Sequence, residues 1–434
     1  MNANRRVFLK GALGAAGVAG MGSWRQAFAD GTADAAAGRI WEGWRSGEFQ
    51  IHFIYTGVAE SIFLIFPDST TMLLDCGDHA AVTRLDLAVP VLPNPTRLSG
   101  DWIARYVQKV NPNRDQVDYM MASHLHQDHV GSSTWQSRRV ISKADTTGCF
   151  RSGFGLALEQ LHFRKAIDRG WPDYTDPVPY KEDDCRLLEH MKRIYSYLAK
   201  RDGLTVEKFR LGADDQIVPL RDPTSVNGFS VRNIAVNGKI ILPDGTIVDT
   251  LRKNGRLADN FNENLLSIAN VFTYGKFRFY TAGDFSGPAS FKGGTAWFPE
   301  KEIGRASGRV DVAKVNHHGH RCMERETVRD LAARVYIACV WDQLHMTDDT
   351  MTRICDRSLY QEDRVVCPTV LTKERRKSEG ERFWMKDIPA AVYEGAHVVV
   401  TVPPGGEKYS VSFIGASDEK MLVRSVIHFK STGC

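Results

Sequence analysis

Residues 123–131 of the chain read SHLHQDHVG, and a short apolar run comes directly before them. If that run is a strand that passes into an extended loop, side chains two residues apart point the same way, so His124 and His126 can bind one metal ion together. If Asp128 and His129 begin a helix, they face another direction and can bind a second ion. Imidazole and carboxylate ligands suit zinc, with manganese or iron as alternatives. A chance cluster of surface or capping histidines is the alternative interpretation, and the density of potential ligands argues against it.

Two later segments carry similar residues at the ends of predicted strands. Residues 316–320 read NHHGH after an apolar run, so six of the 13 histidines lie in two short windows. Residues 280–284 read YTAGD, in which Gly283 permits a sharp turn that presents the carboxylate of Asp284. One carboxylate between two divalent ions can bridge them at a separation of about 3.5–4 Å. A Gly-Asp pair alone is more often a plain turn, but its place between two histidine clusters favours the bridging role.

The composition is that of an ordinary globular protein. The 434 residues are 43% hydrophobic and 25% charged, which suits one large domain with insertions or two domains. No run of about 18 apolar residues is present, so we expect no spanning helix and no stable membrane association. The formal net charge is +4, but residues 1–29 hold four basic and no acidic residues, which leaves 52 of each sign. That balance gives no support for nucleic acid as a partner. It does not exclude a local basic channel that binds nucleic acid.

The first 29 residues are typical of a targeting signal. Residues 4–10 read NRRVFLK, a weakly apolar run rich in Gly and Ala follows, and residues 27–29 read AFA, with small residues where a signal peptidase cuts. The paired arginines resemble a twin-arginine signal, and a frayed basic helix is the alternative. We therefore predict a signal peptide at 1–29, a linker at 30–48, a periplasmic or secreted location, and the twin-arginine export machinery as a partner.

The eight cysteines are scattered along the chain without a Cys-x-x-Cys pair, which argues against a structural zinc ribbon. Folding in the cytoplasm before export also argues against a scaffold built on disulfides. Several cysteines, such as Cys339 within the apolar run 335–340, are expected to act as small hydrophobic residues in strands.

Apolar and alternating segments predict two groups of strands. The expected strands lie at 50–55, 61–66, 71–74, 117–121, 230–248, 265–272, 276–282, 310–315, 335–340, 396–402 and 409–414. Helical spacing is found at 102–110, 157–167, 184–200 and 328–333. Strands followed by helices in two successive halves favour an α/β fold, namely an αββα sandwich with two facing sheets. Residues 132–215 lack strand alternation, so we predict a helical insertion there, between the two halves.

The order His-x-His-x-Asp-His, Gly-Asp and His-His-Gly resembles the metallo-β-lactamase superfamily. The closer likeness is to the branch that forms the soluble hydrolase domain of competence DNA-uptake proteins. That branch also has Asp-x-Gly after a strand, a Glu-Asn-x-x-Ser element, and a His-Pro element after His-His-Gly. The matching residues are Asp75 and Gly77, then Glu263, Asn264 and Ser267, and His345 with Met in place of Pro. The resemblance covers roughly residues 49–415 outside the insertion, which sets a metallo-β-lactamase-fold hydrolase domain at 49–434.

The resemblance implies a role for each matching residue. The implied ligands of two zinc ions, or of manganese or iron, are His124, His126, Asp128, His129, Asp284 and His318. Asp284 would bridge the ions, while Asp75 would orient the metal loop by hydrogen bonds or, as the alternative, is a plain turn residue. His317 competes with His318 for the ligand role, and we favour His318.

The expected function is that of an exported, metal-dependent hydrolase. Two ions lower the pKa of a shared water, and the resulting hydroxide attacks a carbonyl or phosphoryl centre. Asp128 would accept a hydrogen bond from the nucleophile, and His345 would assist the leaving group. The alternative for His345 is a core or capping histidine. The branch resembled favours phosphodiester bonds, and the neutral mature chain keeps small-molecule ester, thioester or lactone substrates open. The alternative is a non-catalytic module of the same fold that holds metal or binds a partner.

One departure from the family concerns the first metal. Many members supply a third histidine between the main motif and the Gly-Asp, and His162 and His190 are the histidines in that interval here. Both lie in segments with helical spacing, where surface or packing histidines are expected. Two histidines, the bridging Asp284 and water would then hold the first ion, which predicts weaker binding and keeps a mononuclear site open.

Overall fold

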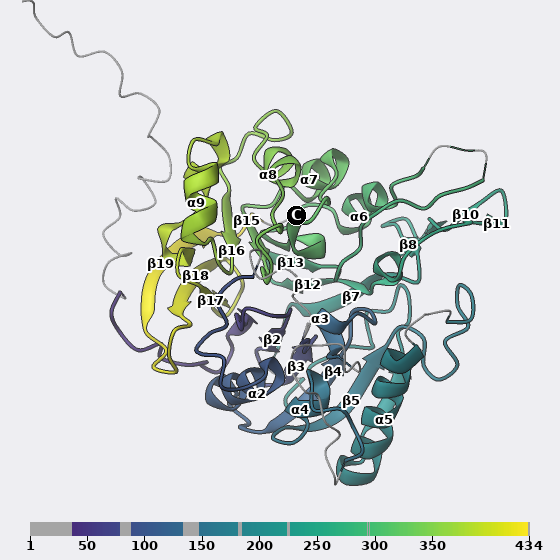
Figure 1. Cartoon of the computed structure of the whole chain (residues 1–434), viewed down its shortest axis with the longest axis horizontal. Coiled ribbons are helices and arrows are strands. Elements are labelled where there is room, and N and C mark those ends of the chain that lie inside the picture. Colours follow the sequence, from purple (N-terminus) through teal and green to yellow (C-terminus); the bar gives the residue numbers. More distant parts are fainter. Residues whose placement is uncertain are drawn as a thin grey trace, which may run out of the picture.

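Two large β-sheets face each other in this chain, and helices lie on the outer side of each (Figure 1). The computed structural model describes residues 37–78, 88–132, 147–180, 185–223, 226–292, 294 and 296–432. The arrangement is the α/β sandwich expected from the sequence. The predicted signal peptide at 1–29 lies outside the described residues, so the twin-arginine assignment stays a prediction.

The first sheet contains both the earliest and the latest described strands. Its nine described strands have the order β19-β18-β17-β1-β2-β3-β4-β5-β6. Their bounds are β1 Phe49–Phe53, β2 Ile62–Ile65, β3 Thr71–Leu74, β4 Gln116–Met121, β5 His162–Asp168, β6 Thr205–Lys208, β17 Ala396–Val402, β18 Lys408–Gly415 and β19 Val423–Lys430. β1 to β3 are antiparallel, whereas β3 to β6 are parallel. β17 pairs with β1, so segments far apart in the sequence complete one sheet.

The second sheet is formed by the middle of the chain. Its eight described strands have the order β16-β15-β14-β13-β12-β7-β8-β9. Their bounds are β7 Phe229–Val236, β8 Lys239–Ile241, β9 Ile247–Asp249, β12 Ala269–Tyr274, β13 Phe277–Thr281, β14 Val312–Lys314, β15 Val335–Ala338 and β16 Val365–Pro368. β13 to β16 are parallel, so their carboxyl ends meet at one edge of the sheet. A separate hairpin, β10 Arg252–Lys253 with β11 Arg256–Leu257, projects from the body (Figure 1).

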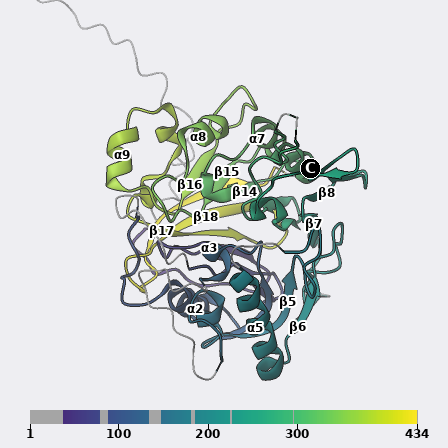
Figure 2. The same cartoon turned by 45° about the vertical axis from the view of Figure 1, so that its right-hand side comes forward.

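Helices cover the outer face of each sheet, and Figure 2 shows the two sets above and below the paired sheets. The helices packed on the first sheet are α2 Ser99–Val110, α4 Phe154–Ala157 and α5 Cys185–Asp202. Those packed on the second sheet are α6 Glu300–Ser307, α7 Arg325–Leu331 and α8 Asp348–Ile354. The other helical segments are α3 Gln127–Val130, α9 Lys373–Glu379, η2 Glu263–Leu266, η3 Asn316–Gly319, η4 Phe383–Asp387 and η5 Ala390–Val392.

Alternation along the strands explains the layers. In β2, Ile62 and Leu64 join the core between the sheets, while Phe63 and Ile65 join the core under the helices. The inner core contains aromatic contacts among its aliphatic residues, as at Phe49 of β1, whose ring centroid lies 6.0 Å from that of a phenylalanine of β12. Because both faces of β2 are buried, the sequence of this strand is a continuous apolar run.

The predicted helical insertion at 132–215 is not confirmed. The helix expected at 157–167 is wrong, because His162–Asp168 forms strand β5 and pairs in parallel with β4. Charged side chains at Arg164 and Lys165 conceal the strand in the sequence. Pairing with the central strand β4 decides the conformation, since sheet context overrides local propensity. The helix expected at 184–200 is present as α5, and β6 follows it at the edge of the sheet.

The last strand of the first sheet, β19, has no counterpart among the strands predicted from the sequence. β19 pairs with β18, and only three of its eight residues are buried, so its sequence lacks the apolar run of a central strand. Six described cysteines are free and buried, and Cys339 is a core residue as expected. No helix in the described part of the chain has the length and apolar character needed to cross a bilayer.

Candidate metal centre

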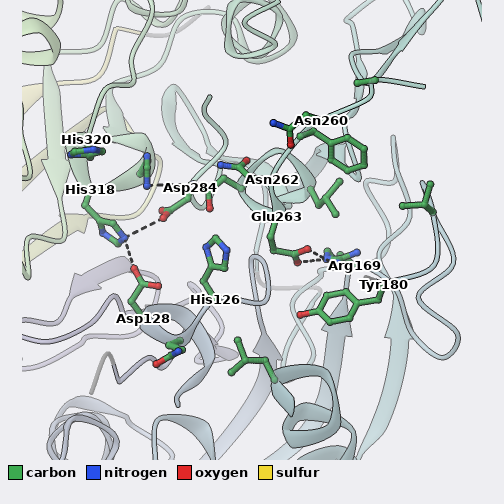
Figure 3. Close-up of a pocket in the computed structure, with 18 of the residues that line it drawn as sticks. His126, Asp128, Arg169, Tyr180, Asn260, Asn262, Glu263, Asp284, His318 and His320 are labelled. Atoms are coloured by element: carbon green, nitrogen blue, oxygen red, sulfur yellow. Dashed lines mark hydrogen bonds and ion pairs between the residues drawn. The ribbon is translucent and has the colours of Figure 1, made fainter. Parts of the chain in front are cut away.

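The predicted site residues come together where strands of both sheets end. In the first sheet, β4 leads into residues 122–130, which include α3. In the second sheet, β13 leads to Asp284 and β14 leads to η3, which contains His318. Figure 3 shows Asp128, Asp284 and His318 directed toward one another, with His126 beside them. The centre is therefore built from both halves of the sandwich.

Four side-chain atoms converge at one point of this group. His318 Nε2 lies 2.9 Å from Asp128 Oδ2 and 3.2 Å from Asp284 Oδ2. His129 Nε2 lies 3.2 Å from Asp284 Oδ2 and 3.7 Å from Asp128 Oδ2. All four side chains are buried. Two imidazole nitrogens and two carboxylate oxygens form a donor set that suits a divalent ion such as zinc.

The hydrogen bonds at Nδ1 of His129 and His318 direct the two Nε2 atoms toward a point where an ion would bind. His129 Nδ1 lies 2.8 Å from Asp75 Oδ2, and His318 Nδ1 lies 2.9 Å from the carbonyl oxygen of Cys339. These contacts assign a proton to each Nδ1, which directs the Nε2 lone pairs toward the carboxylates. Among the described residues, His129 Nε2 has no hydrogen-bond partner of acceptable geometry. A buried polar atom left in this state is unfavourable unless a ligand such as a metal ion meets it.

The electrostatics of the centre favour positive charge. Burial alone would lower the pKa of His129, but the carboxylates of Asp284, Asp128 and Asp75 outweigh it and raise this pKa well above its usual value. Burial also opposes the charged form of His318, yet Asp284 and Asp128 raise its pKa to about 9. The carboxylates thus favour positive charge at this point, and either protons or a divalent ion can supply it.

Asp75 holds the histidine loop in place. Its carboxylate accepts hydrogen bonds from Ser123 N and Ser123 Oγ, each 2.7 Å long, in addition to its contact with His129. Asp75 is fully buried and has a φ of 59°, a left-handed conformation that is uncommon outside glycine. At Gly77, a Cβ atom would lie 1.8 Å from the carbonyl oxygen of Asp128, so only glycine fits. The Asp-x-Gly element thus shapes the loop, which is the role that the resemblance implies.

His124 and His126 lie beside this group and form a smaller set. His124 Nε2 and His126 Nδ1 are 3.0 Å apart, and the ring centroids of His124 and His129 are 4.2 Å apart. Burial, helped by the neighbouring histidines, lowers the pKa of His124 well below its usual value, so this imidazole is neutral and able to bind metal. Within the described residues, these two histidines belong to no group of three ligand atoms lying within 4.8 Å of one another.

Neither histidine of the intervening segment reaches the centre. His162 lies on β5, where its Nδ1 is 2.9 Å from Asp202 Oδ1. His190 is buried within α5 beside Phe150, with ring centroids 5.8 Å apart. Both histidines serve local packing or surface contacts, so the structure supplies no third histidine for the first metal from the described part of this segment.

Two buried charged residues behind the centre were missed in the sequence. Glu60 Oε2 lies 3.1 Å from Lys314 Nζ and 3.3 Å from His318 Nδ1. Lys314 Nζ also lies 3.7 Å from Asp284 Oδ1. Burial alone would raise the pKa of Glu60 and lower that of Lys314, and the attraction between the two opposes both shifts. A lysine at the end of an apolar strand, directly before the second histidine cluster, is the signal that could have revealed this pair.

Glu60 and Asp128 are alternative fourth members of the centre. Glu60, His129, Asp284 and His318 form a buried group that could hold a metal ion. Glu60, however, faces Nδ1 of His318, which already contacts a backbone carbonyl, and is paired with Lys314. The oxygen of Asp128 lies on the Nε2 side, where the lone pair is directed. Asp128 is therefore the better placed ligand, and Glu60 supports His318 from behind.

His317 has a different environment from His318. Its Nδ1 lies 3.0 Å from Ser286 Oγ, and its Nε2 lies 3.3 Å from Asn264 Nδ2. Both ring nitrogens of His317 thus have protein partners, whereas His318 directs Nε2 at the two carboxylates. The η3 segment separates the two rings through left-handed φ angles of 44° and 52° at these positions. The geometry favours His318 as the ligand.

His345 lies against the centre from the loop after β15. Its ring stacks on that of His318, with centroids 4.8 Å apart and planes 17° apart. The backbone N–H of Trp341 donates to His345 Nδ1 at 3.3 Å, so the neutral ring carries its proton on Nε2. Burial lowers the pKa of His345 well below its usual value, which keeps the ring neutral. The indole N–H of Trp341 donates to Asp128 Oδ2 at 3.1 Å.

The Glu-Asn-x-x-Ser element connects the second half of the chain to the histidine loop. Glu263 Oε1 accepts a hydrogen bond from Leu125 N at 3.0 Å, and Ser267 Oγ accepts one from Asp284 N at 3.2 Å. Arg169 donates to both carboxylate oxygens of Glu263, at 2.6 and 2.7 Å. Arg169 was not predicted, because it follows the strand that the sequence pattern assigned to a helix.

A cavity of about 940 Å³ opens over the centre. It is lined by His126, Asp128, Asp284, His318 and His345 at one end and reaches Arg169 and Tyr180 (Figure 3). Its volume is within the range of about 300–1,000 Å³ that is typical of small-molecule sites. No protein-family model matches the chain, and no curated protein matches it.

Proposed function

We propose that this chain is a metal-dependent hydrolase of the metallo-β-lactamase type. The proposal rests on the convergence of His129, His318, Asp128 and Asp284 at one buried point beside a cavity. The order of the motifs in the sequence supports the same assignment. Zinc is the proposed ion, with manganese or iron as alternatives, because two imidazoles and two carboxylates are ligands that zinc accepts. A second ion would bind at His124 and His126.

The residues around the centre suit hydrolysis. A bound ion would polarise the oxygen of the substrate and lower the pKa of water. Asp128 Oδ2, fixed by the indole of Trp341, is placed to accept a hydrogen bond from the attacking water. His345 carries its proton on Nε2 and can donate it to the negative charge that develops on the substrate or leaving group. The stack of His345 on His318 keeps that donor beside the reacting atoms.

Asp284→Asn tests the proposal. The substitution keeps the size of the side chain and removes the charge that faces both imidazoles. In zinc-loaded protein that hydrolyses p-nitrophenyl butyrate or bis-p-nitrophenyl phosphate, we expect kcat to fall at least about a hundredfold, roughly 2.7 kcal/mol. Asp215→Asn is the matched control, because Asp215 is a surface residue with a 70% exposed side chain. Circular dichroism establishes that both variants are folded.

The same measurements separate an enzyme from a binding module. A non-catalytic protein of this fold would contain metal by plasma mass spectrometry and hydrolyse neither test substrate. A hydrolase would contain metal and lose its turnover in Asp284→Asn but not in Asp215→Asn. A folded Asp284→Asn protein with wild-type turnover would contradict the role of Asp284 and the two-metal mechanism.

A further inference from the structure

The described wall of the cavity over the centre has no lysine or arginine that is free of an ion pair, unlike a site for anionic substrates. Arg169 is the one lysine or arginine in the described part of its wall. The side chain of Arg169 is 2% exposed, and both oxygens of the Glu263 carboxylate accept its hydrogen bonds. Because Glu263 also lines the cavity, this ion pair adds no net charge to the wall. Among the described residues of the wall, an anionic ligand therefore has no lysine or arginine partner that is free of an ion pair.

Carboxylate side chains of the described wall also disfavour an anionic ligand. Asp259 and Asp342 also line the cavity, whereas the two carboxylates of the centre are assigned to the metal ion. Asp259 is paired with Arg256 at 2.8 Å. Asp342 Oδ1 accepts a hydrogen bond from Leu344 N at 2.6 Å, an interaction that leaves the negative charge of Asp342 in place. A substrate with a second negative charge away from the reacting bond would meet repulsion rather than neutralisation.

The rest of the wall offers apolar surface and amide groups. The apolar lining residues are Val178, Leu187, Leu257, Phe261, Leu266 and Leu344. Asn260 and Asn262 add side-chain amides on the side of Glu263 that is away from Tyr180 in the view of Figure 3. Apolar walls with a few polar groups are typical of sites that bind uncharged small molecules. Amide side chains can both donate to a carbonyl and accept from a hydroxyl.

We propose that the substrate is an uncharged carboxylic ester or lactone with an apolar acyl chain. This inference rests on the proposed hydrolase function and specifies its substrate. The carbonyl group would lie at the centre, the acyl chain along the leucines, and the polar part at Asn260 and Asn262. Water adds to the carbonyl carbon, the bond from that carbon to the alkoxy oxygen breaks, and a proton passes to that oxygen. The products are one carboxylic acid and one alcohol.

Two inhibitors that differ only at the far end of the chain, where one has a methyl group and the other a carboxylate, test the proposal. Octanohydroxamic acid and suberic acid monohydroxamate have the same metal-binding group and the same chain length, but the second ends in a carboxylate. We expect zinc-loaded protein to bind octanohydroxamic acid at least about tenfold more tightly in titration calorimetry. Equal or tighter binding of the carboxylate-ended inhibitor overturns the inference.

Leu344→Lys makes the test more specific. Leu344 lines the cavity and is 49% exposed, so a lysine at this position adds a cation to the wall without burying it. The preference for octanohydroxamic acid should shrink about tenfold or reverse in this variant. Leu422→Lys is the matched control, because Leu422 is 38% exposed and does not line the cavity. An unchanged preference in Leu344→Lys overturns the inference that the wall selects against charge.

Hydrolysis of chromogenic substrates distinguishes failure of the hydrolase proposal from failure of the substrate proposal. A metal-loaded protein that cleaves none of p-nitrophenyl butyrate, p-nitrophenyl hemisuccinate and bis-p-nitrophenyl phosphate contradicts the hydrolase, while the hydroxamate titration still reports the charge preference of the cavity. A protein that cleaves only bis-p-nitrophenyl phosphate is a hydrolase and contradicts the ester substrate alone. A protein that cleaves the hemisuccinate faster than the butyrate is a hydrolase and contradicts the uncharged substrate alone. Faster cleavage of the butyrate supports both proposals.

Discussion

The two metal positions predicted from the sequence are built to different degrees. At one, which we call the His129 position, two imidazoles and two carboxylates converge, and hydrogen bonds to Nδ1 orient both imidazoles. At the other, the His124 position, two imidazoles of one loop lie 3.0 Å apart, with no completed ligand group among the described residues. The His129 position draws on both sheets, so the fold itself fixes its geometry. We therefore expect the His129 position to bind its ion more tightly than the His124 position.

The largest effect is expected behind the His129 position, where Lys314 is buried against Glu60. Removal of one charge from a buried pair leaves the other uncompensated, which costs about 3–5 kcal/mol. Lys314→Met should lower the free energy of unfolding by this amount in urea denaturation. The double variant Glu60→Gln/Lys314→Met should recover part of the loss, because it removes both charges. A single variant as stable as the wild type would show that the pair does not support the centre.

Substitution of a ligand should separate the two positions directly. His129→Ala removes one imidazole and leaves the Asp75 carboxylate buried without it. We expect the dissociation constant of the tightest zinc ion to rise at least about a hundredfold, roughly 2.7 kcal/mol. Competition with a chromogenic chelator measures the change, and His162→Ala, with a side chain 43% exposed on β5, is the control. Wild-type affinity in His129→Ala would place the ion elsewhere.

Asp75→Asn should have a smaller effect on the same affinity. The amide keeps the shape of the side chain but bonds less strongly to His129 Nδ1 and to Ser123. Loss of such a supporting hydrogen bond to a metal ligand costs about tenfold to a hundredfold in affinity. The chelator competition detects the loss, with the exposed Asp215→Asn as the reference. Affinity equal to that of the reference would reduce Asp75 to a turn residue.

The smallest effect is expected at the His124 position. His126→Ala should weaken the ion at the His124 position about tenfold, roughly 1.4 kcal/mol, and leave the ion at the His129 position bound. Metal content after dialysis at low zinc should then fall from two ions per chain to one. If His126→Ala emptied both positions, the order of affinities proposed here would be reversed.

The sequence alone indicates that the candidate ligands of residues 123–131 lie near one another, because their spacing is local and does not depend on the fold. The stretch 123–131 places its ligands by the geometry of a strand, a loop and one helical turn. Asp284 and His318 lie far along the chain from that stretch. Only the order of the motifs in the sequence indicated that they belong to the same site. The structure brings all of these side chains together, and the α/β sandwich is as expected.

The parts that the sequence concealed depend on contacts between distant segments. Glu60 precedes a strand as a turn residue would, and its partner Lys314 becomes a buried charge only when the two sheets meet. Arg169 follows β5, which consists largely of helix-compatible residues and becomes a strand by pairing with β4. Each case requires a partner that local periodicity does not report.

The origin of the ligands in both sheets has a consequence for folding. His318 and Asp128 are 190 positions apart in the chain, and an ion between them would act as a removable cross-link. The unfolded chain rarely holds such distant groups together, so the ion can be retained only after the sheets have docked. Binding of the ion would thus be a late step in folding. Separation of the two sheets at the centre would have to release the ion first. Chelation should therefore shorten the lifetime of the native state more than it alters its shape.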